Sequence, residues 1–446
     1  MKLWDKGYDI DGFTELFTIG KDRELDVMLA GADVIGNLAH LKMLHTVGLV
    51  NEAEYKSLQR ALVDIHGMVE RGEFVIEEGI EDVHSQIELL LVRECGDAGK
   101  KIHTGRSRND QVLLDLKLFT REAIFETLEH IERLFDLLIR RAGENKDVLI
   151  PGYTHLQVAM PSSFGLWFGA YAESLADDLL ALKAAYDMVN TNPLGSGAGY
   201  GSSIALNRQM TTDLLGFSSL AYNVVYAQMQ RGKMEKNVLF GLAAVATTLG
   251  RLAADVCLFA CSNFGFVRLP DKYTTGSSIM PHKKNPISAE NMAGLARLIR
   301  SNAVASMENQ ALWHERDISH SSVERVIMPD STILADYVLN RLCRLLDGLV
   351  VKPERMKENM ERSYGLYFSQ RVLTALIATG LPRQKAYEAV QRLAMQSWET
   401  RKPFPELVCA DPDMHERLGD AQLAELFDPT YYLKYEDVIY KRVFGN

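Results

Sequence analysis

Residues 238–259, VLFGLAAVATTLGRLAADVCLF, decide the fold class because their apolar side chains repeat with the period of a helix. Large apolar residues follow one another at alternating intervals of four and three, at Val238, Leu242, Val245, Leu249, Leu252, Val256 and Phe259. That spacing places them on one face of a long α-helix. Phe240 and several alanines fill the positions between them, so the helix is apolar almost all round. Such a helix is typical of a bundle centre or of a subunit interface.

A second stretch shows the same rhythm, and alternating strand patterns are scarce. Its apolar residues are Ile124, Leu128, Ile131, Phe135 and Leu138. Breaks rich in Gly, Pro and Asn fall at residues 143–153, 190–203 and 263–278. We therefore expect an all-α protein whose centre is a bundle of long helices. The expected domains are a mostly helical N-terminal domain (1–106), the central bundle (107–350) and a smaller helical C-terminal domain (351–446).

The composition favours a soluble protein that does not bind nucleic acid or membranes. The 446 residues include 47% hydrophobic and 24% charged side chains, and 49 basic against 59 acidic residues give a net charge of −10. That balance disfavours attraction to polyanions, so an anionic ligand must meet a local cluster of cations. The five cysteines indicate reduced thiols in the cytoplasm. The N-terminal residues lack a signal-peptide pattern, and the apolar run 238–250 is too short to span a membrane.

The glycine-rich segment 195–201, GSGAGYG, superficially resembles a nucleotide-binding loop. It lacks the G-x-G-x-x-G spacing, and no β-branched strand precedes it. The pattern therefore indicates a tightly turned loop and not a dinucleotide site.

Three polar segments between the expected helices gather groups that can carry chemistry. The first, 103–111, is HTGRSRNDQ, whose cation and neutral donors just ahead of a long helix suit a carboxylate or a phosphate. A helix cap formed by Asn109 or Asp110 explains the same pattern equally well. The second, 152–157, is GYTHLQ, which places His155 in an expected loop. A lone His is more often structural than catalytic.

The third segment, residues 274–300, is TTGSSIMPHKKNPISAENMAGLARLIR. Asn285 and Pro286 form a good helix start, with Asn as the cap and Pro at the first helical position. Capping leaves the two serines and two lysines before them unexplained. The segment is therefore a candidate for a flexible loop with a function of its own.

Residues 276–290, GSSIMPHKKNPISAE, resemble the signature of the fumarase/aspartase superfamily, whose members eliminate fumarate from succinyl-containing substrates. Up to residue 285 the chain is similar to argininosuccinate lyases. The matching segments are KLW (2–4), EDVHSQIE (81–88), KKIHTGRSRNDQV (100–112) and PGYTHLQVAMPSSFGLWFGAYAE (151–173). After residue 286 the chain resembles adenylosuccinate lyases instead, in residues 285–301, 311–341 and 365–381.

This resemblance implies a role for each residue that matches the family motifs. Ser277 is implied as the general base, and Lys283 and Asn285 as stabilisers of the carbanion. His155 paired with Glu290 is implied as the proton donor to the leaving nitrogen or as a partner in charge transfer. The residues implied in substrate binding are Thr104, Ser107, Arg108, Asn109, Thr154 and His84. Arg316, Ser321 and Arg325 match positions that hold the nucleotide phosphate in adenylosuccinate lyases. A capping box at residues 321–324 and ion pairs of the two arginines with Glu315 or Glu324 explain these three residues equally well.

The resemblance also implies the assembly and the reaction. It implies a homotetramer with a 20-helix core, in which three chains build each active site, and acid–base chemistry without a metal or an organic cofactor. The reaction expected first is cleavage of argininosuccinate into arginine and fumarate. Cleavage of adenylosuccinate is the alternative, and a catalytically silent structural protein of the same fold is a third reading that the retained site residues disfavour.

Overall fold

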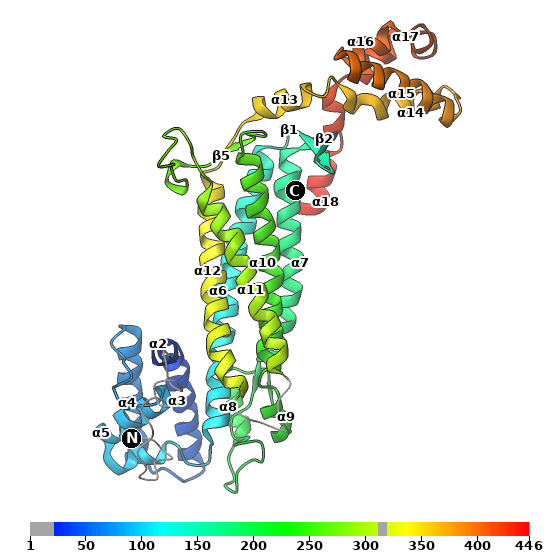
Figure 1. The fold of residues 1–446 in the computed structure, drawn as a ribbon. Helices are drawn as coiled ribbons and strands as arrows, with labels where there is room; N and C mark the ends of the chain where they lie inside the picture. The colour runs from blue at the N-terminus through cyan, green and yellow to red at the C-terminus, as the bar shows by residue number, and fades with distance from the viewer. Residues whose placement is uncertain (1–21, 311–318, 446) are drawn as a thin grey trace. The chain divides into compact units, whose positions relative to one another are not determined.

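The computed structural model describes residues 22–310 and 319–445 of the chain, and these are mostly α-helical (Figure 1). They belong to two compact units. Unit 1 comprises Met1–His130, Asp178–Thr247 and Leu295–Val338, and unit 2 comprises Ile131–Asp177, Thr248–Gly294 and Leu339–Asn446. The boundary between the units passes through five long helices, which are α6 (Arg108–Glu144), α7 (Phe164–Val189), α10 (Lys233–Ala260), α11 (Ile287–Asn309) and α12 (Ser319–Asp347).

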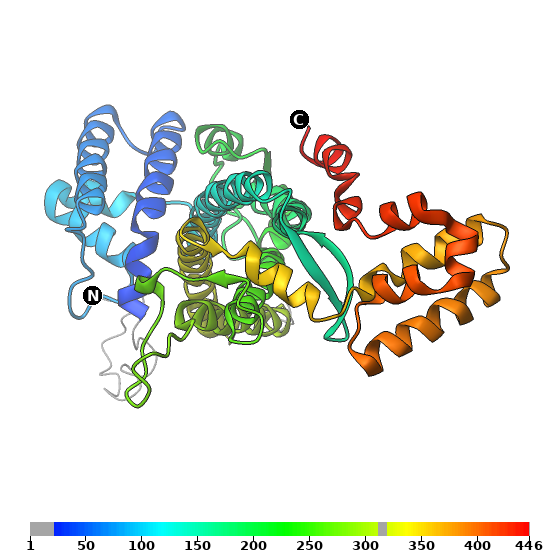
Figure 2. The same cartoon turned by 90° about the horizontal axis from the view of Figure 1, so that it is seen from above.

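The two helices expected from periodicity are confirmed as α6 and α10. All seven apolar repeat positions of α10 are buried, from Val238 to Phe259. In α6, Ile124, Ile131 and Leu138 are buried as well. Between the repeat positions of α10, Leu239, Ala246 and Ala253 are buried as well, while Phe240 faces outward and is 43% exposed. The long helices pack side by side, as both views show (Figures 1 and 2).

Unit 1 contains a helical N-terminal part that packs around its own apolar core. Its elements are α2 (Asp22–Asp26), η1 (Val27–Leu29), α3 (Ala30–Thr46), α4 (Glu52–Glu70), α5 (Val83–Cys95) and η2 (Gly96–Lys101). Leu41, Leu58 and Leu91 are fully buried in this core. Asn51 and Glu54 form a capping box that fixes the start of α4.

The rest of unit 1 joins the long helices through short elements. These are β3 (Thr191–Asn192) paired in parallel with β4 (Ser219–Leu220), α8 (Arg208–Leu214) and α9 (Val224–Met229). Leu114, Leu194 and Phe217 form a small second core there.

Unit 2 carries an antiparallel hairpin, β1 (Leu149–Thr154) and β2 (Gln157–Ser163), where the sequence predicted only a loop. A second antiparallel pair joins β5 (Val267–Arg268) to β6 (Val350–Val351), and η3 (Asp271–Tyr273) follows β5. The C-terminal elements are α13 (Pro353–Glu361), η4 (Leu366–Phe368), α14 (Ser369–Ala378), α15 (Arg383–Thr400), α16 (Phe404–Ala410), α17 (Pro412–Leu426), η5 (Pro429–Leu433) and α18 (Glu436–Phe444). Phe368, Leu376 and Phe404 centre the core of these helices.

Two helical stretches, Arg23–Thr46 and Lys233–Ala260, are long and apolar enough to cross a membrane by length and composition alone. The helix α10 extends beyond the short apolar run seen in the sequence, so it passes this test. Leu41 and Leu44 in the first stretch and Val245 and Leu249 in the second are buried inside the protein. A core helix of a soluble protein has the same length and composition, and these buried faces fit that role.

Candidate active site

The first polar segment forms the start of α6 in unit 1. Ser107 stands directly before the helix, and its Oγ accepts the N–H of Asn109 at 3.3 Å. Oδ1 of Asp110 accepts the N–H of Ser107 at 2.8 Å, which closes a reciprocal cap. The expectation that Asn109 or Asp110 occupies the N-cap position is therefore wrong, because both lie inside the first turn, although the Asp110 carboxylate takes part in the cap. Thr104 is half-buried, and its carbonyl contacts Nε2 of His40 at 2.9 Å.

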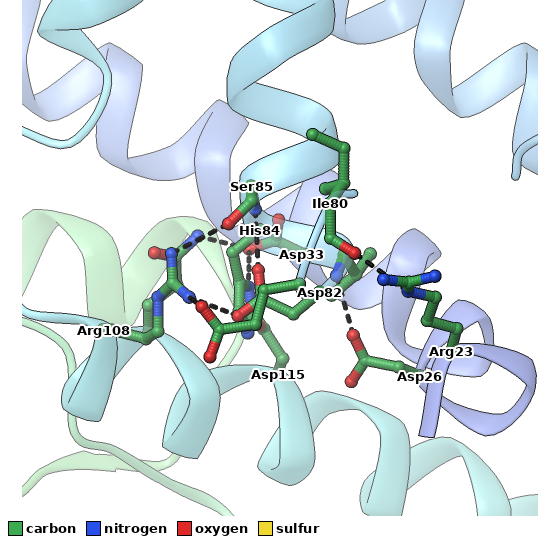
Figure 3. A network of polar contacts seen from close by, with 12 residues as sticks. Arg23, Asp26, Asp33, Ile80, Asp82, His84, Ser85, Arg108 and Asp115 are labelled. Atoms are coloured by element: carbon green, nitrogen blue, oxygen red, sulfur yellow. Dashed lines mark hydrogen bonds and ion pairs between the residues drawn. The ribbon is translucent and has the colours of Figure 1, made fainter. Parts of the chain in front are cut away.

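Arg108 is held by the EDVHS segment at the start of α5 (Figure 3). Its guanidinium donates to Oδ2 of Asp82 and, at 3.0 Å, to Oγ of Ser85. Oδ1 of Asp82 also accepts the N–H of Ser85 at 2.9 Å, which caps α5. Two motifs far apart in the sequence therefore meet, and the head of Arg108, 26% exposed, has a fixed direction.

His84 lies buried between two carboxylates (Figure 3). Its Nδ1 is 3.2 Å from Oδ1 of Asp33 and 3.4 Å from Oδ2 of Asp115. Burial lowers the pKa of His84, but the charge and hydrogen bond of Asp33 outweigh it and raise the pKa. Burial and the neighbouring Asp33 raise the pKa of Asp115 well above its usual range. The cluster therefore favours a protonated imidazole beside one ionised and one neutral carboxyl.

Among the described residues, Asp33, His84 and Asp115 are also the set whose ligand atoms, all within 4.8 Å of one another, could hold a metal ion. Oδ1 of Asp33 already accepts Nε2–H of Gln111 at 2.7 Å. The buried guanidinium of Arg106 interacts with both carboxylates. A resident cation beside a fixed guanidinium is unfavourable, so these groups suit proton sharing better than metal binding.

A small polar cavity of about 10 Å³ lies beside His84 and Arg108. Its lining residues are Asn37, His84, Ile87, Glu88, Ile102, His103, Arg106, Arg108 and Gln111. Among the residues that the structure describes, Nε and Nη1 of the buried Arg106 have no hydrogen-bond partner. The cavity therefore presents cationic donors to a space the size of about one water molecule.

Of these lining residues, sequence reasoning named only His84 and Arg108 as site candidates, and the ionisable residues that it missed are Glu88, His103 and Arg106. Burial and the charge of Arg106 lower the pKa of His103 to about 4, so its imidazole is neutral at neutral pH. Burial raises the pKa of Glu88. The sequence carried a signal for each, because His103 and Arg106 belong to the first polar segment and Glu88 lies one helical turn after His84.

The residues that match the phosphate-binding positions of adenylosuccinate lyases lie partly outside the described chain. Arg316 and Glu315 fall outside the described residues. Ser321 is buried and Arg325 is exposed, both on α12 in unit 1. The capping-box explanation is wrong, because α12 already begins at Ser319 and the carboxylate of Glu324 pairs with Arg231 at 2.6 Å.

The second polar segment forms the tip of the β1–β2 hairpin in unit 2. Thr154 pairs with Gln157 across a two-residue turn made of His155 and Leu156. Both turn residues have left-handed backbone angles, with φ of 53° and 61°, which non-glycine residues rarely adopt. The hairpin therefore presents the exposed Thr154 and His155 at a strained tip, a type of conformation that clusters at functional sites.

The signature segment forms a loop in unit 2 that is closed at its base. The backbones of Thr275 and Asn285 exchange hydrogen bonds of 3.1 and 2.8 Å, and the Asn285 side chain donates to the carbonyl of Gly276 at 3.3 Å. Oγ of Ser277 accepts the N–H groups of Ile279 at 3.2 Å and Met280 at 3.1 Å. The sequence predicted that Asn285 caps α11, and this prediction is wrong, because Asn285 closes the loop and the helix begins at Ile287.

Within the chain, the expected site residues form two groups, one in each unit. Lys283 and Glu290 are exposed in unit 2, with Glu290 in the first turn of α11. The groups are Thr104, Ser107, Arg108, Asn109, His84, Ser321 and Arg325 in unit 1, and Thr154, His155, Ser277, Lys283, Asn285 and Glu290 in unit 2. Their catalytic and binding roles remain predictions.

Two family models match the chain, one over residues 13–300, described as lyase, and one over residues 365–443, described as adenylosuccinate lyase C-terminus. The chain is 52% identical to an argininosuccinate lyase of Parabacteroides distasonis, over 87% of this chain and 86% of the relative. It is 36% identical to an argininosuccinate lyase of Thermotoga neapolitana (87% and 97%) and 38% identical to an adenylosuccinate lyase of Aquifex aeolicus (80% and 82%).

Solved structures share the fold. A fumarate lyase from Mesorhizobium sp. BNC1 superposes with a TM-score of 0.80 at 22% identity, over 96% of this chain and 97% of that one. An EDDS lyase in complex with formate gives a TM-score of 0.74 at 22% identity, over 98% and 93%. The resemblance read from the signature segment is confirmed, and the chain belongs to the fumarase/aspartase family of lyases, with a C-terminal part of the adenylosuccinate lyase type.

Proposed function

We propose that this chain is an argininosuccinate lyase, which cleaves argininosuccinate into arginine and fumarate in the cytoplasm without an added cofactor. The observation that carries the proposal is the 52% identity to an argininosuccinate lyase over 87% of the chain. A match of that extent necessarily includes most of the residues after 286. The change of resemblance at that position therefore does not interrupt the similarity to argininosuccinate lyases.

The reaction removes a weakly acidic proton from the carbon next to a carboxylate and then breaks a C–N bond. The hydroxyl of Ser277 acts as the base. A serine is a poor base in water, but the two backbone N–H groups that point at its Oγ stabilise the alkoxide. Lys283 and Asn285 stand on the same closed loop and stabilise the negative charge that spreads into the substrate carboxylate.

His155, oriented by Glu290, donates the proton to the leaving nitrogen. Thr154, Ser107 and Asn109 bind the succinyl carboxylates, and Arg108 binds the remainder of the substrate. The fixed position of Arg108 supports its part in this assignment, because its guanidinium is 26% exposed and is held in one direction by Asp82 and Ser85.

Each active site is completed by three chains of a homotetramer with a 20-helix core. Exposed apolar side chains on the long helices support this assembly, because large ones on a helix surface mark contact faces. They include Phe240 on α10, Leu298 and Val304 on α11, and Val326 and Ile333 on α12, each more than 40% exposed.

The alternative function is cleavage of adenylosuccinate, a different N-succinyl substrate. The match of residues 365–443 and the Aquifex aeolicus relative favour it. Ser321 and Arg325 are the described residues that would hold its phosphate.

The test supplies argininosuccinate and adenylosuccinate separately to the purified protein and follows fumarate by its absorbance. We expect turnover of argininosuccinate, and turnover of adenylosuccinate alone would overturn the proposal. Ser277→Ala should lower kcat by a factor on the order of 10³, the usual contribution of a positioned base. Ser278→Ala changes the neighbouring hydroxyl in the same loop and should leave kcat unchanged, which makes it the matched control.

A further inference from the structure

The glycine-rich loop 195–201 does not bind a nucleotide phosphate in this protein, because a carboxylate of the chain itself occupies it. The N–H groups of Gly195 and Gly197 both donate to Oδ2 of Asp110, at 2.8 and 3.0 Å. Gly195 and Gly197 have φ of 82° and 61°. Left-handed residues turn successive N–H groups toward one point and create a small anion-binding nest. Asp110 fills that nest and is fully buried.

Both glycines are required for this geometry. A Cβ on Gly197 would lie 2.7 Å from the carbonyl oxygen of Gly201, and a Cβ on Gly195 would lie 2.8 Å from Cγ of Arg208. At positive φ any other residue would also be strained. The loop is therefore shaped around the carboxylate and has little freedom to move away from it.

The same carboxylate reaches the substrate-binding segment with its other oxygen. Oδ1 of Asp110 accepts the N–H of Ser107 at 2.8 Å. Ser107 is followed by Arg108 and Asn109, the first residues of α6. One buried side chain thus joins a loop and a segment that lie more than 80 residues apart in the sequence.

The charge of Asp110 is balanced within unit 1. Burial raises the pKa of Asp110, while the three N–H donors and the charge of Arg106 oppose that rise. Arg208, beside the loop, interacts with the same carboxylate and donates its Nε–H to the carbonyl of Leu194 at 2.8 Å. The link is therefore a compensated, fully bonded network, which is the kind that fixes a local geometry.

We propose that Asp110 is a positioning residue of the lyase reaction: its carboxylate locks the nest of the loop 195–201 to Ser107 and so fixes where Ser107, Arg108 and Asn109 meet the substrate. This inference rests on the proposed function. A displacement of about 1 Å in a positioning group lowers the rate by a factor on the order of 100. The link acts on bound substrate and on the transition state together, so its loss raises KM more than it lowers kcat.

The first test is Asp110→Asn, in the full-length protein. The amide must turn its N–H₂ group toward Ser107 or toward the two glycines, so donors face donors and part of the link is lost. We expect KM for argininosuccinate to rise about tenfold, the cost of one charge-assisted hydrogen bond. Amide exchange at Gly195 and Gly197, read by mass spectrometry, should accelerate at least about tenfold.

The matched control is Thr127→Val. Oγ1 of Thr127 is buried in the same unit and donates to the carbonyl of Ala123 at 2.7 Å, and it contacts neither Asp110 nor the loop 195–201. This variant loses a buried hydrogen bond without disturbing the nest, so its thermal stability should fall while KM stays unchanged. If Asp110→Asn exposes the two amides but matches the control in KM, Asp110 is only structural and the proposal is overturned.

Gly197→Ala strains the nest from the side of the loop and leaves the side chain of Asp110 unchanged. It should raise KM in the same way, and the double variant should exceed the larger single effect by little, because both act through one link. If the increases in KM of the two single variants multiply in the double variant, the two residues act independently and the proposal is overturned. A measurement on the unmodified enzyme needs no variant, since saturating fumarate should slow exchange at Gly195 and Gly197, and unchanged exchange would contradict the link. If the original enzyme does not cleave argininosuccinate, the proposed function is refuted instead. Amide exchange at Gly195 and Gly197 in Asp110→Asn still tests the link in that case.

Discussion

Lys117 on α6 is the largest fully buried side chain of the described residues with a charge at its end. Its Nζ donates to Oγ1 of Thr191 at 2.6 Å and to Oε1 of Gln230 at 2.8 Å. Burial lowers the pKa of Lys117 from 10.5 to about 7, although the charge of Glu235 opposes the shift. The folded protein therefore holds the Lys117 proton much less tightly than the unfolded chain does.

That difference makes stability depend on pH in a defined direction. Between pH 7 and 10.5 the unfolded chain binds the Lys117 proton and the folded protein releases it, so this group makes the protein more stable as pH rises. Two pH units within that window are worth about 2–3 kcal/mol, at 1.36 kcal/mol for each unit of pKa difference. Burial also raises the pKa of Glu235 to about 8, which acts in the opposite direction between pH 4.5 and 8.

We expect Lys117→Met to remove the contribution of the lysine to the pH dependence of the free energy of unfolding, while the methionine keeps a similar side-chain volume. The free energy of unfolding of the original protein, minus that of the variant, should therefore rise by about 2 kcal/mol between pH 7 and pH 9. Urea denaturation at one protein concentration measures it at both pH values. Lys183→Met, at a side chain that is 73% exposed, is the control and should show no such change. An equal difference between the original protein and Lys117→Met at both pH values would refute the reasoning.

Three further changes test other parts of the structure. Glu324→Ala leaves the buried Arg231 uncompensated and should lower the free energy of unfolding by about 3–5 kcal/mol in urea denaturation, and a cost below about 1 kcal/mol would contradict a buried pair. Leu156→Gly relieves a left-handed residue at an exposed tip and should raise that free energy by about 1 kcal/mol, so a lower melting temperature would argue against strain. Asp33→Asn removes the charge that raises the pKa of His84, so the imidazole loses its proton at a lower pH. As pH is raised, kcat/KM should therefore begin to fall at a lower pH than in the original enzyme. An unshifted pH profile would exclude a role for protonated His84 in substrate binding.

The long helices were predictable because their evidence is repeated many times along the chain. Val238, Leu242 and Leu249 all lie on the buried face of α10, so one apolar residue outside that pattern, such as the exposed Phe240, does not obscure the helical period. The hairpin at 149–163 was not predictable in this way. Its turn uses His155 and Leu156, whereas the usual signals for such a turn are Asn and Gly.

The site was predictable in its segments but not in its contacts. The polar stretch 103–111 pointed to a function, yet only the fold shows that Asp82 orients Arg108 and that Asp33 holds His84. These partners are distant in the sequence and look like ordinary charged residues there. The helix starts were wrong at Asn109 and Asn285 for two different reasons. At Asn109 the helix already begins at Arg108, with Ser107 directly before it, and at Asn285 a hydrogen bond to the carbonyl of Gly276 takes the side chain that local capping rules assigned to the helix.

The paired backbones of Thr275 and Asn285 have a practical consequence for engineering. They hold both ends of the signature loop at one fixed spacing, so side chains between them that carry no proposed role can be changed without shifting the start of α11. The entropy cost of ordering such a tethered segment on ligand binding is smaller than that of an open loop of equal length. The loop is therefore suited to side-chain variation. A library of variants substituted at residues 278–282 would vary substrate access, while Ser277, Lys283 and the base of the loop stay in place.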